Sequence, residues 1–292
     1  MGIYEILAYF FVYGVLGWCV EVAFAAVKEG RFVNRGFLNG PICPIYGVGV
    51  VSVIFSLQGF SESLLILYLA SAVLVTFIEW LTGYVMDRIF HQKWWDYSGQ
   101  PLNIGGYVCL PFSLIWGVFC VFIVKCFQPL VAHLIGYIHH IAGIVILVIL
   151  SIAMIADLYV TASAILKLNK RLEAMEKIAA ELREFSDRMG ENIYENVKDG
   201  MEKEEQLKSK VASMKEVRKE LRAEYSAGKE EWYKSQQQKL DELKGRYDSL
   251  VNELGSVGER LVKAFPNMES RIHKDALREV KKRVAMRRNK RK

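Results

Sequence analysis

The sequence predicts an all-α membrane protein, with five transmembrane helices followed by a cytoplasmic coiled coil or helical hairpin. The first observation behind this fold class is the uneven distribution of charge. Residues 1–165 carry 6 Lys or Arg and 8 Asp or Glu, whereas residues 166–292 carry the remaining 32 basic and 24 acidic residues. A single soluble domain does not separate its charges in this way. The distribution therefore excludes a secreted disulfide scaffold, a collagen and a soluble enzyme with one core.

The second observation is a series of apolar runs in the first half. Crossing a hydrocarbon core of ~30 Å takes about 20 apolar residues. Runs of this kind cover about residues 3–27, 42–60, 63–86, 107–127 and 141–166, which defines a five-span domain over residues 1–165. The first run has no basic residue before it and contains Glu5 and Glu21. We therefore interpret it as a retained span rather than a signal peptide.

Basic residues near the span ends predict the orientation. Lys28, Arg31 and Arg35 follow the first run, Arg88 and Lys93 follow the third, and further basic residues follow the fifth, whereas the other side has only Lys125. Because cytoplasmic loops are enriched in Lys and Arg, we expect a multi-pass protein of the cell membrane with its N-terminus outside and its C-terminus in the cytoplasm.

The first cytoplasmic loop contains three glycines and two prolines within residues 36–47. Proline lacks a backbone donor and glycine adopts conformations that other residues avoid, so this stretch is not a regular helix. Irregular backbone at membrane depth persists only where protein or water covers it. The loop is thus either a broken, re-entrant entrance to the second span, with free backbone N–H groups, or a tight turn before an ordinary helix.

Carboxylates inside apolar spans are the strongest functional signal. They are costly in lipid and usually face a bundle interior or a water-filled cavity with a partner. Arg35 and Arg88 are the candidate partners of Glu21 and Glu79. A structural ion pair and a substrate or ion site both explain these carboxylates. The candidate substrate-binding residues, all toward the cytoplasmic side, are Glu21, Asn34, Arg35, Gly40, Glu79, Asp87, Arg88 and Asp96.

The second cytoplasmic loop follows the third span and has two further readings. Trp94, Trp95 and Tyr97 are typical of interfacial anchors, with a ligand-stacking platform as the alternative. Asp87 and His91 have a helical spacing that allows two metal ligands, but a third is missing, so we assign no metal and no cofactor.

Several separated motifs resemble those of the type IV ABC-transporter permease family (CmpB-like), over roughly residues 5–165. The first is the run from Asn34 to Gly47, and the others are Gly17-Trp18 with Glu21, Glu79 with Thr82-Gly83-Tyr84, Trp95-Asp96-Tyr97-Ser98, Asn103, Gly106, and Ser113 with Trp116-Gly117. The resemblance implies a polytopic bacterial membrane protein. It also implies a permease component that works with a separate nucleotide-binding subunit.

The second half predicts long amphipathic helices. Residues 144–189 contain neither proline nor glycine, so the fifth span continues outward as one helix. Apolar residues from Leu172 to Ile193 recur at three- and four-residue steps, and those from Leu240 to Leu261 follow a strict heptad spacing. With breaks expected at Asp199-Gly200 and Ala227-Gly228, residues 166–265 form a coiled-coil region that pairs within one chain, with a second copy or with a partner helix.

Residues 266–292 form a basic C-terminal tail beyond Pro266. Ten basic residues lie between Lys274 and Lys292, against Asp275 and Glu279. An anionic cytoplasmic leaflet attracts each basic residue by about 1 kcal/mol. Nucleic acid attracts the same charges, but the membrane is already adjacent, so we favour anionic lipid. A disordered, solubilising tail is the alternative.

The leading functional hypothesis is a transporter permease component with a cytoplasm-facing polar site. Its alternative is a membrane-anchored coiled-coil scaffold or sensor. A lipid-headgroup-modifying enzyme ranks third, since the sequence has no phosphate-binding G-x-x-x-x-G-K-[ST] loop, no H-E-x-x-H and no G-x-S-x-G.

Overall fold

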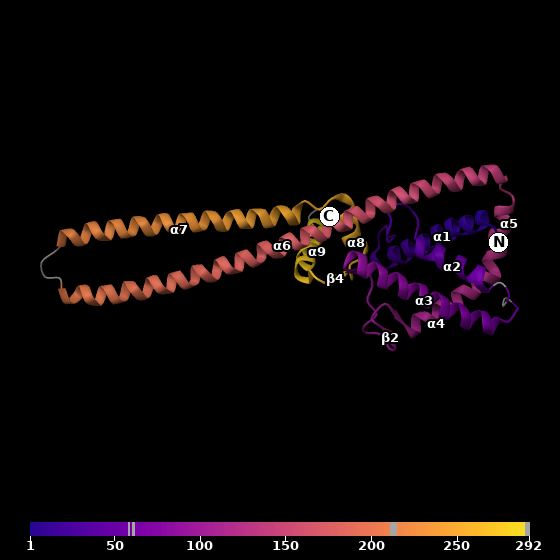
Figure 1. Cartoon of the computed structure of the whole chain (residues 1–292), viewed down its shortest axis with the longest axis horizontal. Coiled ribbons are helices and arrows are strands. Elements are labelled where there is room, and N and C mark those ends of the chain that lie inside the picture. The colour runs from indigo at the N-terminus through magenta and orange to yellow at the C-terminus, as the bar shows by residue number, and fades with distance from the viewer. Residues whose placement is uncertain (58, 60–61, 211–214, 290–292) are drawn as a thin grey trace. The chain divides into compact units, whose positions relative to one another are not determined.

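The computed structural model describes residues 1–57, 59, 62–210 and 215–289 and divides the chain into two compact units (Figure 1). The first unit contains Met1–Lys170 together with Gly255–Lys292. The second unit is Arg171–Leu254. The C-terminal segment thus clusters with the apolar half, and the second unit is an insertion between two parts of the first.

The apolar half of the first unit is helical. It consists of α1 (Ile3–Glu29), α2 (Pro44–Leu57), α3 (Leu64–Phe90), α4 (Leu110–Phe122), the π-helical turn η2 (Ile123–Phe127), α5 (Gln128–Gly136) and the first part of α6 (His140–Lys210). In the described part of the chain, four helices are long and apolar enough to cross a membrane: Ile3–Glu29, Leu64–Phe90, Leu110–Gly136 and His140–Asn192. These apolar helices support a membrane protein, and four of the five expected spans contain a helix of this length.

The expected second span, 42–60, is the one that is shortened. Helix α2 has 14 residues, which is only about 21 Å at 1.5 Å per residue. The irregular loop runs up to Cys43, and α2 begins at Pro44, where the missing backbone N–H is tolerated in the first helical turn. The Gly- and Pro-rich loop therefore includes residues 42 and 43, which the hydropathy pattern assigns to the span.

Helices α1 and α2 pack antiparallel and closely. Gly47 faces Phe10, and the backbone N–H of Cys43 donates to the carbonyl of Gly14 at 2.9 Å. A Cβ atom at Gly47 would lie 2.5 Å from the carbonyl oxygen of Phe10. Small residues at this interface are what allow two backbones to approach within a membrane. The surrounding buried cluster includes Tyr13, Leu38, Val50, Ile54 and Leu147.

The third and fourth apolar segments also pack antiparallel. Gly117 of α4 faces Tyr68 and Ala72 of α3, while Gly83 near the other end of α3 faces Tyr107. The π-helical turn η2 separates α4 from α5, which has a proline in its first turn. Such a turn accommodates a proline inside a continuous helical segment, so the apolar segment extends to Gly136 rather than ending near residue 127.

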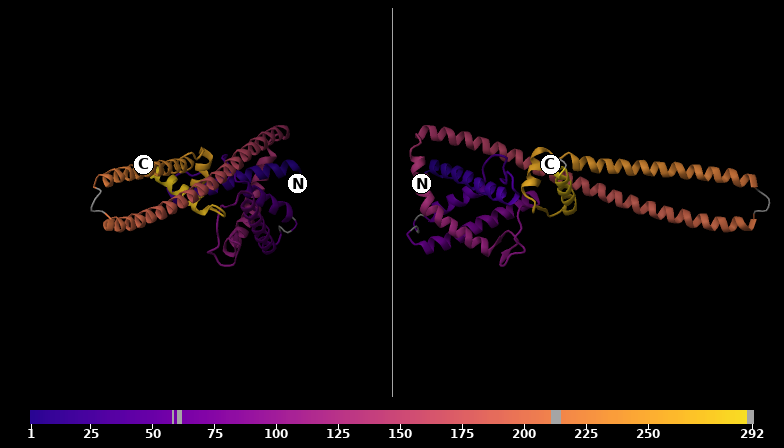
Figure 2. Two further views of the ribbon diagram at one scale, coloured as in Figure 1. Left: turned by 60° about the vertical axis from the view of Figure 1, so that its left-hand side comes forward. Right: turned by 180° about the vertical axis from the view of Figure 1, so that it is seen from behind.

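The second unit contains the outer part of α6 and α7 (Lys215–Asn252), which lie side by side and antiparallel (Figures 1 and 2). The ammonium of Lys239 lies 5.9 Å from the ring centre of Phe185. Leu172, Met175 and Ile178 of α6 and Leu243 and Val251 of α7 are buried. The apolar spacing therefore identified the inner faces of these helices.

The expected helix breaks were wrong. Asp199-Gly200 lies within α6, which has 71 residues, and Ala227-Gly228 lies within α7. The heptad seam is also interrupted, because α7 ends at Asn252 and α8 (Ser256–Ala264) begins after a short non-helical link. Val257 and Leu261, expected in the seam, belong to the first unit. A single glycine in a long helix is tolerated, so glycine alone is a weak breaker.

The C-terminal segment is folded through Asn289. It contains α8, the short strand β4 (Glu269–Ser270) and α9 (Lys274–Asn289). Strand β4 pairs antiparallel with β1 (Gln92–Lys93), with Gln92 opposite Ser270. Ala276, Leu277, Val280 and Val284 bury one face of α9. Lys290, Arg291 and Lys292 of the expected basic tail lie outside the described residues. A second short ribbon joins β2 (Asn103–Ile104) to β3 (Val108–Cys109).

Candidate functional site

A polar cluster lies where α1, α2 and the first loop meet. The hydroxyl of Tyr46 donates to Oε1 of Glu21 at 2.8 Å, and Nε of Arg35 lies 3.5 Å from Oε2 of the same carboxylate. The side chains of Arg35 and Glu21 are each about a quarter exposed, at 28%. The predicted partnership of Arg35 with Glu21 is confirmed, and α2 adds a tyrosine to it.

Glu79 of α3 belongs to the same neighbourhood. The hydroxyl of Tyr97 donates to its Oε1 at 3.4 Å, whereas Oε2 is buried and has no hydrogen-bond partner among the described residues. Burial raises the pKa of Tyr97, and the Glu79 and Glu21 carboxylates add to this shift, which places both acids near one phenol. The predicted Arg88–Glu79 partnership is wrong, since Arg88 lies over the ring of Tyr84, 5.2 Å from its centre.

The first loop is organised around the side chain of Asn34. Its oxygen accepts from Nε1 of Trp18 at 2.7 Å and from the backbone N–H of Gly36 at 3.0 Å, and its nitrogen donates to the carbonyl of Asn39 at 2.8 Å. Every polar group of this amide therefore serves the loop. Asn34 shapes the turn that carries Arg35 and is not turned toward an open site.

The end of the same loop binds Asp157 of α6. The backbone N–H groups of Asn39 and Gly40 donate to this carboxylate at 3.2 and 2.7 Å, and the side chain of Asn39 donates to it at 2.7 Å. The irregular loop thus presents backbone N–H donors, as the Gly- and Pro-rich sequence predicts. They are not free, because they are hydrogen-bonded to Asp157.

Arg260 of α8 covers this loop and was missed by the sequence analysis. Its Nε donates to Oδ1 of Asn39 at 3.0 Å, and its two terminal nitrogens donate to the carbonyls of Gly36 and Phe37 at 2.9 Å each. Burial lowers the pKa of Arg260, and Asp157 opposes that shift. The heptad pattern did not indicate that Arg260 contacts the loop, because a charged residue beside an apolar position is ordinary on a coiled-coil surface.

Asp87 is fully buried and is already paired. It accepts a hydrogen bond from the hydroxyl of Tyr107, and Nε of Arg271 lies 3.1 Å from its Oδ2. Its side chain is 1% exposed, whereas that of Arg271 is 50% exposed. The C-terminal segment therefore supplies the counter-charge for a residue that the sequence assigned to a substrate site.

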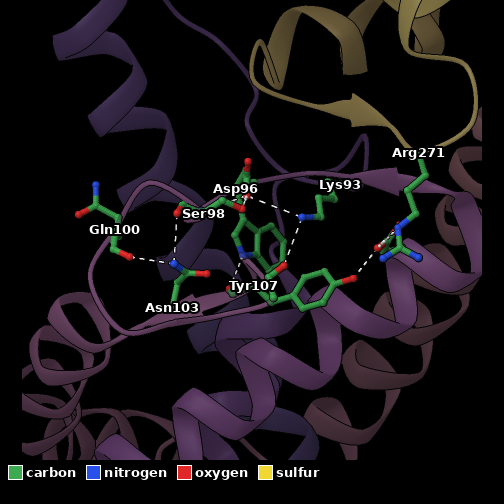
Figure 3. A network of polar contacts seen from close by, with 10 residues as sticks. Lys93, Asp96, Ser98, Gln100, Asn103, Tyr107 and Arg271 are labelled. Atoms are coloured by element: carbon green, nitrogen blue, oxygen red, sulfur yellow. Dashed lines mark hydrogen bonds and ion pairs between the residues drawn. The ribbon is translucent and has the colours of Figure 1, made fainter.

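Asp96 holds the second loop together. It accepts from the hydroxyl and the backbone N–H of Ser98 at 2.5 and 3.1 Å, and Nζ of Lys93 lies 3.7 Å away. Asn103 donates to the carbonyls of Ser98 and Gln100, closing the loop from its other side (Figure 3). These hydrogen bonds from Ser98 lower the pKa of Asp96.

Trp94 lies inside the protein and is not an interfacial anchor. Its ring is 5% exposed and packs edge-on against Phe37 and Phe265, with ring centres 5.3 and 5.0 Å away. Trp95 donates its Nε1 to the carbonyl of Tyr107 at 2.8 Å. Within the described residues no group of three or more His, Cys, Asp or Glu side chains is arranged to hold a metal ion.

The structure therefore sorts the predicted residues into three groups. Glu21, Arg35 and Glu79 gather with Tyr46 and Tyr97, and we call these five residues the polar cluster. Asn34, Gly40 and Asp96 form loop contacts. The last two residues lie outside the polar cluster: Asp87 pairs with Arg271, and Arg88 lies over the ring of Tyr84.

Comparison with known proteins identifies the class of protein. The chain belongs to the membrane-protein family described as "Putative ABC-transporter type IV", whose model matches residues 8–162. The match covers the apolar helices, both loops and Asp157. No curated protein and no solved structure matches the chain.

Proposed function

We propose that this chain is the membrane component of an ABC-type transport system and that the polar cluster contacts the cargo or a coupled ion. The observation that carries the proposal is Glu79. Its Oε2 is buried within an apolar helix and has no hydrogen-bond partner among the described residues. An ionisable group in a membrane span is costly and by default marks a transport pathway, a proton relay or a ligand counter-ion.

The neighbours of Glu79 support this assignment. Glu21 is balanced by Arg35 at 3.5 Å and by the Tyr46 hydroxyl at 2.8 Å, whereas Glu79 has only the longer contact with Tyr97. One carboxylate is therefore compensated and the other is not. The uncompensated one is the group available to a cation, a proton or a hydrogen-bond donor of the cargo.

The proposed orientation places both loops and the C-terminal segment on the cytoplasmic side, with the N-terminus outside. Two facts support it. The basic residues Arg31, Arg35, Arg88 and Lys93 flank these loops, and the structure brings the loops together through Arg260 and Arg271. We further propose that the short helix α2 completes a fifth pass of the chain.

The proposed partners follow from the family and from the charges. An ABC-type membrane component uses a separate nucleotide-binding subunit, since this sequence has no phosphate-binding loop. The exposed side chains of Lys274 and Lys282 on α9 offer a site for anionic lipid. Of the coiled-coil region expected over residues 166–265, the second unit, Arg171–Leu254, remains the proposed site of pairing with a second copy or a partner helix.

The first experiment is affinity purification of the intact protein in mild detergent from its native cells, followed by mass spectrometry. We expect a stoichiometric nucleotide-binding subunit. The ATPase activity of the purified complex is then compared between wild type, Glu79→Gln and the matched control Glu62→Gln, an exposed acid between α2 and α3. We expect Glu79→Gln to change the activity while assembly is retained, and Glu62→Gln to leave it unchanged. Normal activity in Glu79→Gln contradicts the site.

The second unit favours a second candidate, a membrane-anchored scaffold. The 71-residue helix α6 leads directly from an apolar span into the paired helices. For a scaffold, replacing the spans by an unrelated anchor preserves function and deleting residues 171–254 abolishes it. Capture of cell-envelope proteins without any nucleotide-binding subunit also favours this candidate.

A further inference from the structure

Two residues link the loops to both flanks of the inserted second unit. The first is Asn39 in the first loop. Its side-chain nitrogen donates to Oδ1 of Asp157 at 2.7 Å, and its side-chain oxygen accepts from Nε of Arg260 at 3.0 Å. Asp157 precedes the inserted unit in the chain and Arg260 follows it. One amide therefore binds both flanks.

The second residue is Gln92 in the second loop. Its side-chain nitrogen donates to Oδ1 of Asn169 at 2.8 Å, and its backbone pairs with Ser270 in the β1–β4 ladder. Asn169 in turn donates to the carbonyl of Phe90 at 2.7 Å. Gln92 is fully buried, at 0% exposure. Here too, one partner precedes the inserted unit and the other follows it.

The same loops carry side chains of the polar cluster. Arg35 lies in the first loop, between Asn34 and Gly36, whose carbonyls accept from Arg260 at 3.4 and 2.9 Å. Tyr97 lies in the second loop, close after Gln92, and its backbone N–H donates to the carbonyl of Gly106 at 2.9 Å. Fixing the two loops thus fixes the groups that meet Glu21 and Glu79.

We infer that residues 255–271 form a clamp that holds both loops as one unit, with Arg260 as the positioning residue of the polar cluster. The clamp has three attachments: Arg260 on the first loop, the ladder of Ser270 with Gln92, and Arg271 on Asp87. Phe265 joins them by packing on Trp94, 5.0 Å between ring centres. The clamp's role in regulating the cluster rests on the proposed function, whereas the clamp itself does not.

Native cysteines report on each loop. Cys43 ends the first loop and Cys109 ends the second, and both are buried, at 6% and 2% exposure. Cys120 is buried to the same degree, at 6%, but belongs to a separate cluster with Val53, Leu57 and Leu67. Cys19 and Cys126 are exposed. The chain therefore contains two reporters and one buried control, whereas Cys19 and Cys126 lie in apolar helices that are candidate membrane spans and are not used as reporters.

The experiment measures N-ethylmaleimide labelling of each cysteine in the full-length protein in native membranes, by peptide mass spectrometry. It compares wild type, Arg260→Gln and Arg260→Lys. We expect Arg260→Gln to speed the labelling of both Cys43 and Cys109 by about tenfold or more, because tenfold corresponds to only ~1.4 kcal/mol and the lost hydrogen bonds are charged. We expect Arg260→Lys to give a smaller increase, since a lysine keeps the charge but not the fork of donors.

Three results overturn the inference. Unchanged labelling in Arg260→Gln shows that Arg260 does not position the first loop. Faster labelling of Cys43 alone shows that the two loops are held independently. Faster labelling of Cys120 as well shows a general loss of the fold. The proposed function is tested separately by the ATPase activity of Glu79→Gln. The labelling experiment does not depend on that activity, so the two can fail independently.

Discussion

Arg271 forms an ion pair with Asp87, and the two residues lie far apart in the sequence. Nε of Arg271 lies 3.1 Å from Oδ2 of Asp87, and the Tyr107 hydroxyl donates to the same oxygen. The backbone N–H of Arg271 also donates to the carbonyl of His91 at 3.0 Å. The C-terminal segment therefore completes the end of α3 by supplying both a charge and a backbone donor.

The first prediction concerns this ion pair. Arg271→Ala leaves the Asp87 carboxylate buried without its counter-charge. Leaving a buried group uncompensated costs about 1–3 kcal/mol, and the half-exposed arginine places the effect toward the lower end. We expect hydrogen exchange to become faster in residues 265–285 while α1 and α2 stay protected, as measured by mass spectrometry on the detergent-solubilised protein.

Arg278→Ala is the matched control for Arg271→Ala. Arg278 pairs with Asp275 on the same helix at 3.6 Å, and both side chains are largely exposed, at 71% and 85%. Exposed pairs of this kind contribute ~0.2–1 kcal/mol, so exchange in residues 265–285 should hardly change. Equal exchange in the two variants would show that Arg271 is no more than a surface charge.

The second prediction tests the close packing of α1 on α2. Gly47→Ala places a Cβ atom 2.5 Å from the backbone oxygen of Phe10, which cannot rotate away. Overpacking of this kind costs about 1–3 kcal/mol. We expect a lower midpoint of thermal unfolding in detergent. Gly49→Ala is the control, because nothing lies within 4 Å of a Cβ atom there; a neutral Gly47→Ala would contradict the close approach.

The sequence predicted the local features of this fold well. Apolar runs identified the long helices because lipid excludes charge, and the i, i+3, i+4 spacing identified the buried residues Leu172 and Met175. Of the two arginines expected to pair with Glu21 and Glu79, Arg35 pairs with Glu21 across the turn after α1. All of these signals act over short distances in the chain.

The contacts of the C-terminal segment could not be predicted from the sequence, because they join residues that lie far apart in the chain. Arg260 binds carbonyls of residues 36 and 37, and backbone acceptors leave no mark on the amino-acid sequence. Ten basic residues near the end suggested a free, lipid-binding tail. The described buried face of α9 contains Ala276, Leu277, Val280 and Val284, and this short apolar pattern was overlooked beside the many charges.

The third prediction concerns anionic lipid at α9. Lys274 and Lys282 are exposed, whereas Lys281 donates to the carbonyls of Pro266 and Met268 and Arg283 lies 3.4 Å from Glu279. Each exposed lysine contributes at most ~1 kcal/mol near an anionic surface. We expect Lys274→Gln with Lys282→Gln to reduce binding of phosphatidylglycerol in nanodiscs by severalfold. The loss should be smaller at high salt.

A matched control for this lipid test changes lysines away from α9. Lys234 and Lys244 lie on exposed positions of α7, and their change to glutamine removes the same net charge. If both double variants bind lipid equally, the effect comes from total charge and the proposed site on α9 is wrong.

The fourth prediction is that the second loop becomes less ordered at acidic pH. Hydrogen bonds from Ser98 lower the pKa of Asp96, so the ionised carboxylate is favoured in the fold. Its stabilisation is complete above the ordinary aspartate pKa of about 3.9 and is lost as the pH falls through the lowered value in the folded protein. We expect hydrogen exchange in residues 93–106, corrected for the intrinsic rate, to be constant from neutral pH to about 4.5 and to rise below about 3.5.

Asp96→Asn separates this carboxylate from general acid unfolding. The amide cannot ionise, so exchange in residues 93–106 should already be faster at neutral pH and should show no further rise below pH of about 3.5. Asp275→Asn on the exposed face of α9 is the control and should behave as wild type, because its side chain is 85% exposed. An acid-induced rise that persists in Asp96→Asn would show that the transition does not come from Asp96.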